Sequence, residues 1–359
     1  MTKMYKSLKK EDGTYSCFGF LRQGWSLANP ARFLSALHRR LPETSLLQSM
    51  GLLLDYYACL FRYGAIVADY FEYEFWKKRA CVRKEYITMM MNKKIKRVFN
   101  HEPTGVFRNK LLFNEKFAEF RNLRCFDFGK GSKDDFLSFV RACGGDIIAK
   151  PLTGYSGHGI HKPDVSTPEL AGACYDKLKA SGEFFCEETF RQTGILHDVN
   201  PSSVNTIRIY TLNDLGEIVI PFAGIRFGGS AACVDNIHAN GMCCEVDLTS
   251  GIVIGRGFNL SGNRFLRHPV SGLMLIGIQI PRWPEVLDSV RRAALVYPNQ
   301  GHIAWDVAVG DDKVSIIEGN DGGKFDLPQV CTQCGCKALY ANAIARKRRH
   351  APPQRRAGE

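Results

Sequence analysis

Three side chains with oxygen ligands lie close together near the end of the sequence, on two apolar segments joined by a short turn. Asp306 is on the first segment, and Glu318 and Asn320 end the second. The turn Gly310-Asp311-Asp312 predicts a β-hairpin, in which residues two apart point to the same face. Folding would bring the three side chains together, and carboxylate and amide oxygens suit Mg²⁺. An exposed acidic hairpin end is the competing interpretation.

A second group of residues surrounds a glycine-rich loop at 151–160. Lys150 ends the apolar segment before it and would supply a point charge for a phosphate oxygen. The loop is rich in backbone N–H donors, which can close over phosphates. It is not a Walker A loop, because no Gly-Lys-Ser/Thr follows, and its spacing is not that of a dinucleotide fingerprint. Taken alone, the loop is equally typical of a surface hairpin.

Two further segments carry charged residues at the ends of, or within, apolar strands. The strand Phe184-Phe185-Cys186 ends in Glu187 and Glu188, which could offer a carboxylate to a ribose hydroxyl; a strand meeting solvent is the alternative. Arg208 and Arg226 lie among β-branched and aromatic residues. A guanidinium in such a place is either paired with an acid or bound to phosphate.

The order of these features resembles the ATP-grasp superfamily over Lys110 to Gln329. Ser203-Val204-Asn205-Thr206-Ile207-Arg208 and Val234-Asp235-Asn236 look like the sugar-transfer-associated ATP-grasp family, which is linked to cell-surface polysaccharide biosynthesis. The resemblance implies an α+β fold of two lobes that grip ATP, here with a helical N-terminal region. One departure is Asn240, where the family pattern predicts a second glycine.

The resemblance also implies a role for each candidate residue. Two lysines would contact the nucleotide phosphates, namely Lys110 and Lys150. A phosphate lid would be formed by Gly154, Ser156, Gly157 and Gly159. The adenosine pocket would include Glu187 and Glu188, without a choice of which meets the ribose. Mg²⁺ would be held by Asp306, Glu318 and Asn320. Charge on the transferred phosphoryl group would be stabilised by Arg208, and a phosphate or an acceptor carboxylate would be bound by Arg226.

The implied activity is that of an ATP-dependent carboxylate–amine ligase that works through an acylphosphate, joining an amino acid to a surface-polysaccharide sugar or precursor. Its partners would be a small-molecule carboxylate and an amine or sugar acceptor. Three alternatives remain open: a kinase of a hydroxyl acceptor on the same fold, a non-catalytic nucleotide-binding protein, and a basic protein that binds an anionic membrane surface or nucleic acid. Nucleic acid ranks last, because the basic runs lack interleaved aromatic residues.

The elements that position these residues follow from hydrophobic periodicity. Helices are expected at 109–120, 134–143 and 284–297. Strands are expected at 146–150, 206–211, 217–226, 303–309 and 313–318. Four regions are expected: a mainly helical part at 1–100, a first ATP-grasp lobe with the lid at 101–186, a second lobe with the Mg²⁺ site at 187–340, and a basic, disordered tail at 341–359.

Composition limits the class of protein. The chain has 359 residues, a formal net charge of +12 and 13 cysteines. No apolar run reaches the ~18 to 20 residues that a membrane-spanning helix needs, and the N-terminus lacks the apolar stretch of a signal peptide. We therefore expect a cytoplasmic protein with reduced thiols. Cys331, Cys334 and Cys336 have metal-like spacing but lack a matching partner pair, which favours a cysteine-rich turn.

Overall fold

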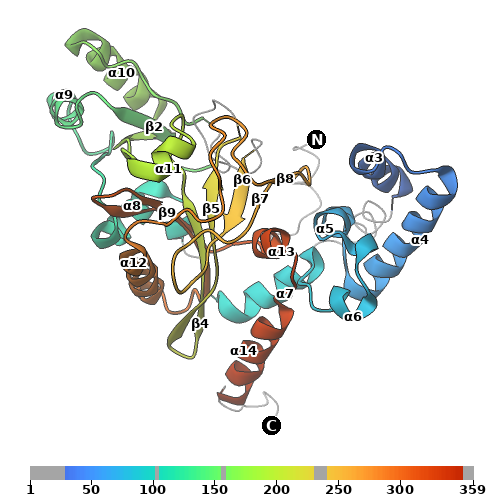
Figure 1. Cartoon of the computed structure of the whole chain (residues 1–359). Helices are drawn as coiled ribbons and strands as arrows, with labels where there is room; N and C mark the ends of the chain where they lie inside the picture. The colour runs from blue at the N-terminus through green and yellow to red at the C-terminus, as the bar shows by residue number, and fades with distance from the viewer. Residues whose placement is uncertain (1–28, 102–104, 155–158, 230–240, 351–359) are drawn as a thin grey trace. The chain divides into compact units, whose positions relative to one another are not determined.

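The computed structural model describes residues 29–101, 105–154, 159–229 and 241–350. Ser156, Gly157 and the Val234-Asp235-Asn236 motif lie outside the described residues. The chain forms two compact units, which are shown with their elements in Figure 1. The first unit comprises residues 1–94 and 333–338, and the second comprises 95–332 and 339–359.

The first unit is helical, as the sequence predicts. Its elements are α3 (Pro30–Arg40), α4 (Leu46–Tyr63), α5 (Val67–Glu72), η1 (Phe75–Lys77), α6 (Ala80–Arg83) and the first half of α7 (Met89–Phe99). Asn29 caps α3 through its side chain, and Ser45 forms a capping box with Gln48 at the start of α4. Gly64 ends α4 in the left-handed conformation with φ of 66°.

Aromatic side chains form the core of this unit. Phe33 on α3 stacks on Tyr56 of α4 with ring centroids 4.8 Å apart, and Tyr73 lies 4.9 Å from Tyr86. All four rings are at most 2% exposed. Segment 333–338 returns to the same unit, where the main-chain N–H of Lys337 donates to the carbonyl oxygen of Glu85 at 2.9 Å.

The second unit contains a small antiparallel sheet in the order β1-β3-β2. Its strands are β1 (Cys125–Phe126), β3 (Phe184–Glu188) and β2 (Ile147–Pro151). Two helices contribute to its core, namely α9 (Lys133–Ala142) and α10 (Pro168–Ser181). Phe136, Val140 and Tyr175 on these helices pack with Ile147 and Cys186 of the sheet.

A larger antiparallel sheet has the order β10-β9-β4-β5-β6-β7-β8. Its strands are β10 (Val314–Asn320), β9 (His302–Val309), β4 (Ile207–Asp214), β5 (Glu217–Phe227), β6 (Met242–Glu245), β7 (Gly257–Phe258) and β8 (Arg264–Phe265). The predicted hairpin is present, with Val314 paired to Val309. Successive residues along each strand point to opposite sides of this sheet.

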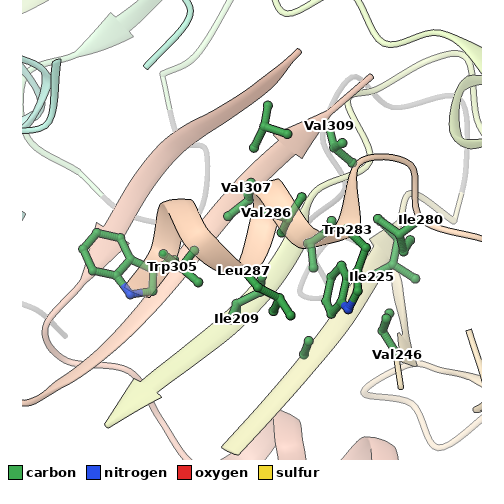
Figure 2. Packing of buried hydrophobic residues seen from close by; sticks show 14 of the residues in the cluster. Ile209, Ile225, Val246, Ile280, Trp283, Val286, Leu287, Trp305, Val307 and Val309 are labelled. Atoms are coloured by element: carbon green, nitrogen blue, oxygen red, sulfur yellow. The ribbon is translucent and has the colours of Figure 1, made fainter. Parts of the chain in front are cut away.

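Helix α12 (Trp283–Val296) covers one side of the large sheet. Figure 2 shows Trp283, Val286 and Leu287 of this helix packed with residues such as Ile209 and Val307 of the strands. The other side carries a smaller apolar cluster in which Tyr210, Phe222 and Cys243 meet α13 (Asp326–Thr332) through Leu327.

Two local expectations need correction. The helix expected at 109–120 is interrupted: α8 (Lys110–Lys116) ends, and a separate turn of 3₁₀ helix, η3 (Ala118–Phe120), follows. The tail expected to be disordered from 341 is helical as far as His350, within α14 (Lys337–His350). Tyr340 of α14 is buried, with its ring 4.6 Å from that of Phe325. In the described part of the chain, no helix is both long and apolar enough to cross a bilayer.

Candidate functional site

Charged residues form a row across three neighbouring strands of the large sheet. Arg208 on β4 is the register partner of Asp306 on β9, and Asp306 is the partner of Glu318 on β10. Residues directly opposite in an antiparallel pair point to the same face. Arg226 on β5 joins the row, since it lies two residues from Gly224, the register partner of Arg208.

Asp306 is the electrostatic centre of this row and is only 4% exposed. Its Oδ1 lies 2.6 Å from Nε of Arg208, and its Oδ2 lies 3.0 Å from Nη2 of Arg208 and 3.0 Å from Nη2 of Arg226. Burial alone would raise the pKa of Asp306, but the two guanidinium groups outweigh it and lower the pKa below its usual value. Asp306 is therefore a carboxylate with two cationic partners.

Glu318 has the opposite electrostatic environment. Withdrawal from water raises the pKa of its carboxyl group, and the adjacent charge of Asp306 raises it further. The side chain of Asn320 lies on the same face, and its Nδ2 is 3.3 Å from Oε1 of Glu318. The structure thus brings together all three residues of the predicted metal site. Of the two carboxylates, Glu318 is the one whose negative charge is not fully balanced by neighbouring cations.

The glycine between Glu318 and Asn320 has a packing reason. A Cβ atom at Gly319 would lie 2.9 Å from Phe107 and 3.0 Å from both Phe113 and Trp305. Only a residue without a side chain fits against these rings. The aromatic cluster on one face of β10 thereby fixes the strand that presents Glu318 and Asn320 on the other.

The two predicted phosphate lysines lie near this row and near Glu187. Lys150 on β2 forms an ion pair with Glu187 on β3, with Nζ and Oε2 2.5 Å apart. Lys110, the first residue of α8, donates from Nζ to the carbonyl oxygen of Gly154 at 3.4 Å. Burial lowers the pKa of Lys110, and the charges that act on it come from Glu318, Lys150 and Glu187. These three side chains are therefore within electrostatic range of Lys110.

Glu187 and Glu188 have different surroundings. Glu187 is 1% exposed and is paired with both Lys150 and Arg121. Burial opposes its ionisation, but these two cations outweigh burial and lower its pKa. Glu188 is less buried and forms a looser pair with Arg124 at 3.4 Å. Glu187 is thus a buried counter-ion, and of the two acids Glu188 keeps more contact with solvent.

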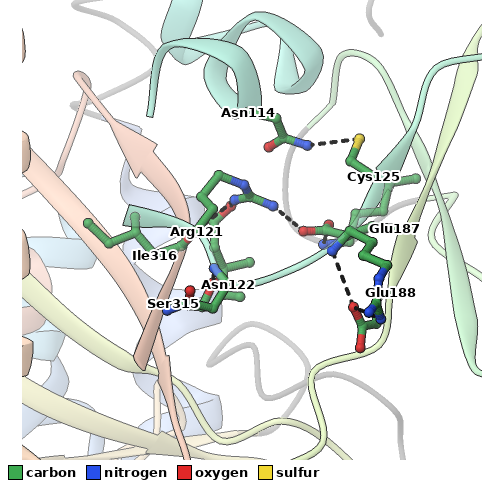
Figure 3. A network of polar contacts seen from close by, with 11 residues as sticks. Asn114, Arg121, Asn122, Cys125, Glu187, Glu188, Ser315 and Ile316 are labelled. Atoms are coloured by element: carbon green, nitrogen blue, oxygen red, sulfur yellow. Dashed lines mark hydrogen bonds and ion pairs between the residues drawn. The ribbon is translucent and has the colours of Figure 1, made fainter. Parts of the chain in front are cut away.

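Arg121 also belongs to this network, although no motif in the sequence marks it. Its Nη1 donates to the carbonyl oxygens of Ile316 and Ile317 on β10, at 2.8 Å and 2.7 Å, while its Nη2 contacts Glu187. Figure 3 shows Arg121 between the small sheet and β10. Asn122 follows with a hydrogen bond from Nδ2 to the carbonyl oxygen of Val314 at 2.6 Å. No local pattern could reveal these contacts, because their partners lie far along the chain.

The loop that precedes β4 is held by a buried asparagine. Nδ2 of Asn205 donates to the carbonyl oxygens of Leu196 and Asn200, at 2.8 Å and 3.0 Å, and its main-chain N–H donates to Oε1 of Gln192 at 2.8 Å. Gln192 in turn donates to the carbonyl oxygen of Val309 at 3.0 Å. Asn205 belongs to the segment 203–208 that resembles the family, and it anchors the strand on which Arg208 lies.

The described ends of the glycine-rich loop have glycine-dependent backbones. Gly154 has φ of 150° and Gly159 has φ of 79°. A Cβ atom at Gly159 would also lie 2.8 Å from Cγ of Pro151. Ser156 and Gly157 lie outside the described residues, so their predicted role in a lid stays a prediction.

The donor set can be compared with the needs of Mg²⁺. Glu318 and Asn320 provide hard oxygen atoms on one face, and Glu318 lies directly beside the carboxylate of Asp306, so a positive charge there would reduce the repulsion between the two acids. Asp306 is adjacent but already contacts two arginines. Among the described residues, no group of three His, Cys, Asp or Glu side chains has the arrangement of a metal site. The residues fit a cation that is bound through few protein ligands, as Mg²⁺ with a nucleotide is.

The fold and the sequence profile place this chain among the ATP-grasp proteins. The chain belongs to the sugar-transfer associated ATP-grasp family, whose sequence profile matches residues 123–345. The family resemblance and the α+β ATP-grasp fold that the sequence predicts are thereby confirmed. No curated protein matches this sequence.

Solved structures with a similar fold include several ligases. The ATP-grasp ligase PsnB, in complex with a phosphomimetic precursor variant, Mg and ADP, has 15% identity and a TM-score of 0.43 over 69% of this chain and 62% of its own. D-cycloserine synthetase DcsG has 11% identity and a TM-score of 0.40, over 72% of this chain and 77% of its own. The D-alanine-D-alanine ligase from Coxiella burnetii has 12% identity and a TM-score of 0.38, over 68% and 58%. The chain spans about three fifths of the PsnB chains it matches, 62% and 63%.

Proposed function

We propose that this protein is an ATP-dependent carboxylate–amine ligase that uses Mg²⁺. Membership in an ATP-grasp family supports the use of ATP. The observation that carries the proposal is the geometry of the row, in which Asp306 and Glu318 are register partners on β9 and β10 and Asp306 contacts Arg208 and Arg226. Lys150, paired with Glu187 on the small sheet, and Lys110, at the start of α8 and bonded to Gly154 of the loop, add positive charge suited to a magnesium-bound polyphosphate.

The roles of individual residues follow from their contacts. Lys110 and Lys150 would bind nucleotide phosphates, and Gly154 and Gly159 would bracket the lid that includes Ser156 and Gly157. Glu187 would hold Lys150 in place rather than contact the ribose, because it is buried between Lys150 and Arg121. Glu188, at the edge of the same strand, is the better candidate for the adenosine side.

Glu318 and Asn320 would hold Mg²⁺, which would neutralise charge on the phosphates. Asp306 would join them when one of its arginine partners turns to substrate. Arg208 or Arg226 would then bind the transferred phosphoryl group or the carboxylate of the acceptor. The pairing of both arginines with Asp306 supports this exchange, because it keeps two cations beside the site without a bound anion.

The reaction would proceed in two displacements. A substrate carboxylate oxygen attacks the γ-phosphorus, the bond to the bridging oxygen breaks and ADP leaves, which gives an acylphosphate. An amine then attacks the acyl carbon, phosphate leaves, and the amine loses a proton. The protein would contribute position and charge neutralisation rather than a covalent nucleophile. We further propose that the carboxylate or the acceptor belongs to a surface-polysaccharide precursor, in keeping with the family's association with sugar transfer.

A substrate screen tests this function. Release of ADP is measured with Mg²⁺ and ATP across amino acids paired with uronic-acid sugars, and active pairs are repeated with hydroxylamine. A ligase gives a hydroxamate of the carboxylate substrate, and formation of this product depends on ATP. A phosphorylated hydroxyl product with no hydroxamate would show a kinase instead. Absence of Mg²⁺-dependent ATP binding would contradict both activities.

A further inference from the structure

One face of helix α4 in the first unit is apolar and exposed along the whole helix. It carries five large side chains that are between 55% and 82% exposed: Leu46, Leu47, Met50, Leu54 and Phe61. Their spacing places them along one side of an 18-residue helix, which is about 27 Å long. We call these five residues the α4 face. A continuous apolar face of this length is uncommon on the surface of a protein that has no partner.

The opposite side of α4 packs into the core of the unit. Tyr56 and Cys59 are fully buried there, and Tyr56 stacks on Phe33 of α3. Asp55, the only acid of α4, is ion-paired with Arg83 at 2.7 Å and accepts a hydrogen bond from the hydroxyl of Tyr70 at 2.8 Å. The α4 face is therefore an additional apolar surface that the core of the unit does not use, and it carries no carboxylate.

The residues around the α4 face are mainly basic. His38 and Arg39 are exposed at the end of α3, which a five-residue segment joins to the start of α4, and Arg62 is exposed in the last turn of α4. Glu43 is the one exposed acid in the connecting segment. Over residues 29–94, eleven lysines and arginines outnumber six aspartates and glutamates. Positive charge at both ends of an apolar strip complements an anionic surface with an apolar interior.

We propose that the α4 face lies on a lipid bilayer that contains anionic lipids, with α4 parallel to the membrane plane and its leucines and Phe61 inserted below the headgroups. Arg39 and Arg62 would contact the lipid phosphates. A second copy of the chain fits the surface less well. Pairing two α4 faces would bring Arg62 toward Arg39 or toward another Arg62, with only Glu43 to offset them. The α4 face shares no residue with the proposed ATP site, so the two proposals can fail separately.

Vesicle co-sedimentation of the full chain without nucleotide tests this proposal. Vesicles of phosphatidylcholine mixed with phosphatidylglycerol are compared with vesicles of phosphatidylcholine alone. The wild type should bind the mixed vesicles. Leu54→Glu should lower the partition coefficient by at least about tenfold, because one leucine can no longer enter the apolar phase. Replacing Arg39 and Arg62 by Gln should lower binding to the anionic vesicles by about fivefold per charge removed.

Two matched variants keep the test specific. Leu54→Met retains an apolar side chain and should bind as the wild type does. Leu295→Glu makes the same change as Leu54→Glu at a leucine that is 51% exposed on α12, and it should also leave binding unchanged. Unaltered thermal unfolding of Leu54→Glu will show that the variant is folded. Lack of wild-type binding to the mixed vesicles would overturn the proposal, and so would equal binding by Leu54→Glu. A dimer that Leu54→Glu converts to a monomer, in the absence of vesicle binding, would identify the α4 face as a contact between copies.

Discussion

Arg121 and Glu187 form a buried ion pair although they are 66 residues apart in the sequence. The same guanidinium donates to the carbonyl oxygens of Ile316 and Ile317, which directly precede Glu318. One side chain therefore connects the strand that carries Glu187 with the strand that carries Glu318. We regard Arg121 as a positioning residue. It holds Glu187, and through Glu187 also Lys150, close to the end of β10 that carries Glu318.

Replacement of Arg121 by Gln should destabilise the second unit strongly. Glu187 would keep Lys150 as a partner but lose its other cation, and two carbonyl oxygens of β10 would lose their donor. Removal of one member of a buried charge network costs about 3–5 kcal/mol in the free energy of unfolding. Arg124→Gln is the matched control, because Arg124 and its partner Glu188 are more exposed, and it should cost at most about 1 kcal/mol. Urea denaturation measures both. Equal costs for the two variants would contradict a special role for Arg121.

The contribution of Glu187 should depend on pH. Its pKa is lowered in the folded protein, so its carboxylate stabilises the fold above the pKa of the unfolded chain, about 4.3. This contribution is lost as the pH falls through the lower, folded pKa. The difference in unfolding free energy between wild type and Glu187→Gln should therefore be large near neutral pH and shrink in acid. Denaturation curves over a pH series test this, with Glu188→Gln, at the more exposed neighbouring carboxylate, as the matched variant. If the difference in unfolding free energy grew as the pH fell, the predicted direction of the pH dependence would be wrong.

Asp306 and Glu318 should respond differently to loss of charge. Asp306→Asn removes the carboxylate that Arg208 and Arg226 both contact and should lower the free energy of unfolding by about 3–5 kcal/mol. Glu318→Gln resembles the protonated form that the raised pKa of Glu318 favours. This variant should be as stable as the wild type, or more stable, in the absence of ligand. Thermal unfolding of the two variants without nucleotide measures the contrast.

Addition of Mg²⁺ and ATP should reverse the ranking of wild type and Glu318→Gln. A ligand at about one hundred times its dissociation constant stabilises the folded wild type by about 2.7 kcal/mol. Glu318→Gln should lose most of this gain, because it lacks the carboxylate proposed to hold Mg²⁺. ATP with EDTA, which removes free Mg²⁺, is the control. It should stabilise both proteins less than Mg²⁺ and ATP stabilise the wild type. Full stabilisation of Glu318→Gln by Mg²⁺ and ATP would remove Glu318 from the metal site.

The elements and the order of the candidate residues could be predicted from the sequence because they depend on local signals. The alternation around Arg208 and the apolar segments around Asp306 predict strands, and the structure contains both strands. The turn Gly310-Asp311-Asp312 predicts their hairpin partner. Those signals also place Asp306 beside Glu318. The meeting of Asp306 with Glu318 could therefore be predicted from pattern alone.

The pairing of charges could not be predicted in the same way. The residues around Arg208 suit either an acid or a phosphate as its partner, and the register between β4 and β9 decides between them. The contact between Arg121 and Ile316 spans 195 residues. The helix at 337–350 could not be predicted because its sequence is dominated by basic residues. Only a few positions, such as Tyr340 and Ala343, are buried and hold it to the second unit.

Gly319 should tolerate no side chain, and this provides a final test of how β10 is held. A methyl group there would press on Phe107, Phe113 and Trp305, with contacts of 2.9 to 3.0 Å. Overpacking of this kind costs about 1–3 kcal/mol, and any shift of the strand would also move Glu318. Gly105→Ala is the control in the same unit, because a Cβ atom at Gly105 has no neighbour within 4 Å. Gly319→Ala should lower the free energy of unfolding and weaken stabilisation by Mg²⁺ and ATP, whereas Gly105→Ala should do neither. If Gly319→Ala were as stable as the wild type and bound Mg²⁺ and ATP equally well, the aromatic cluster would not be what positions the Glu318 side of the site.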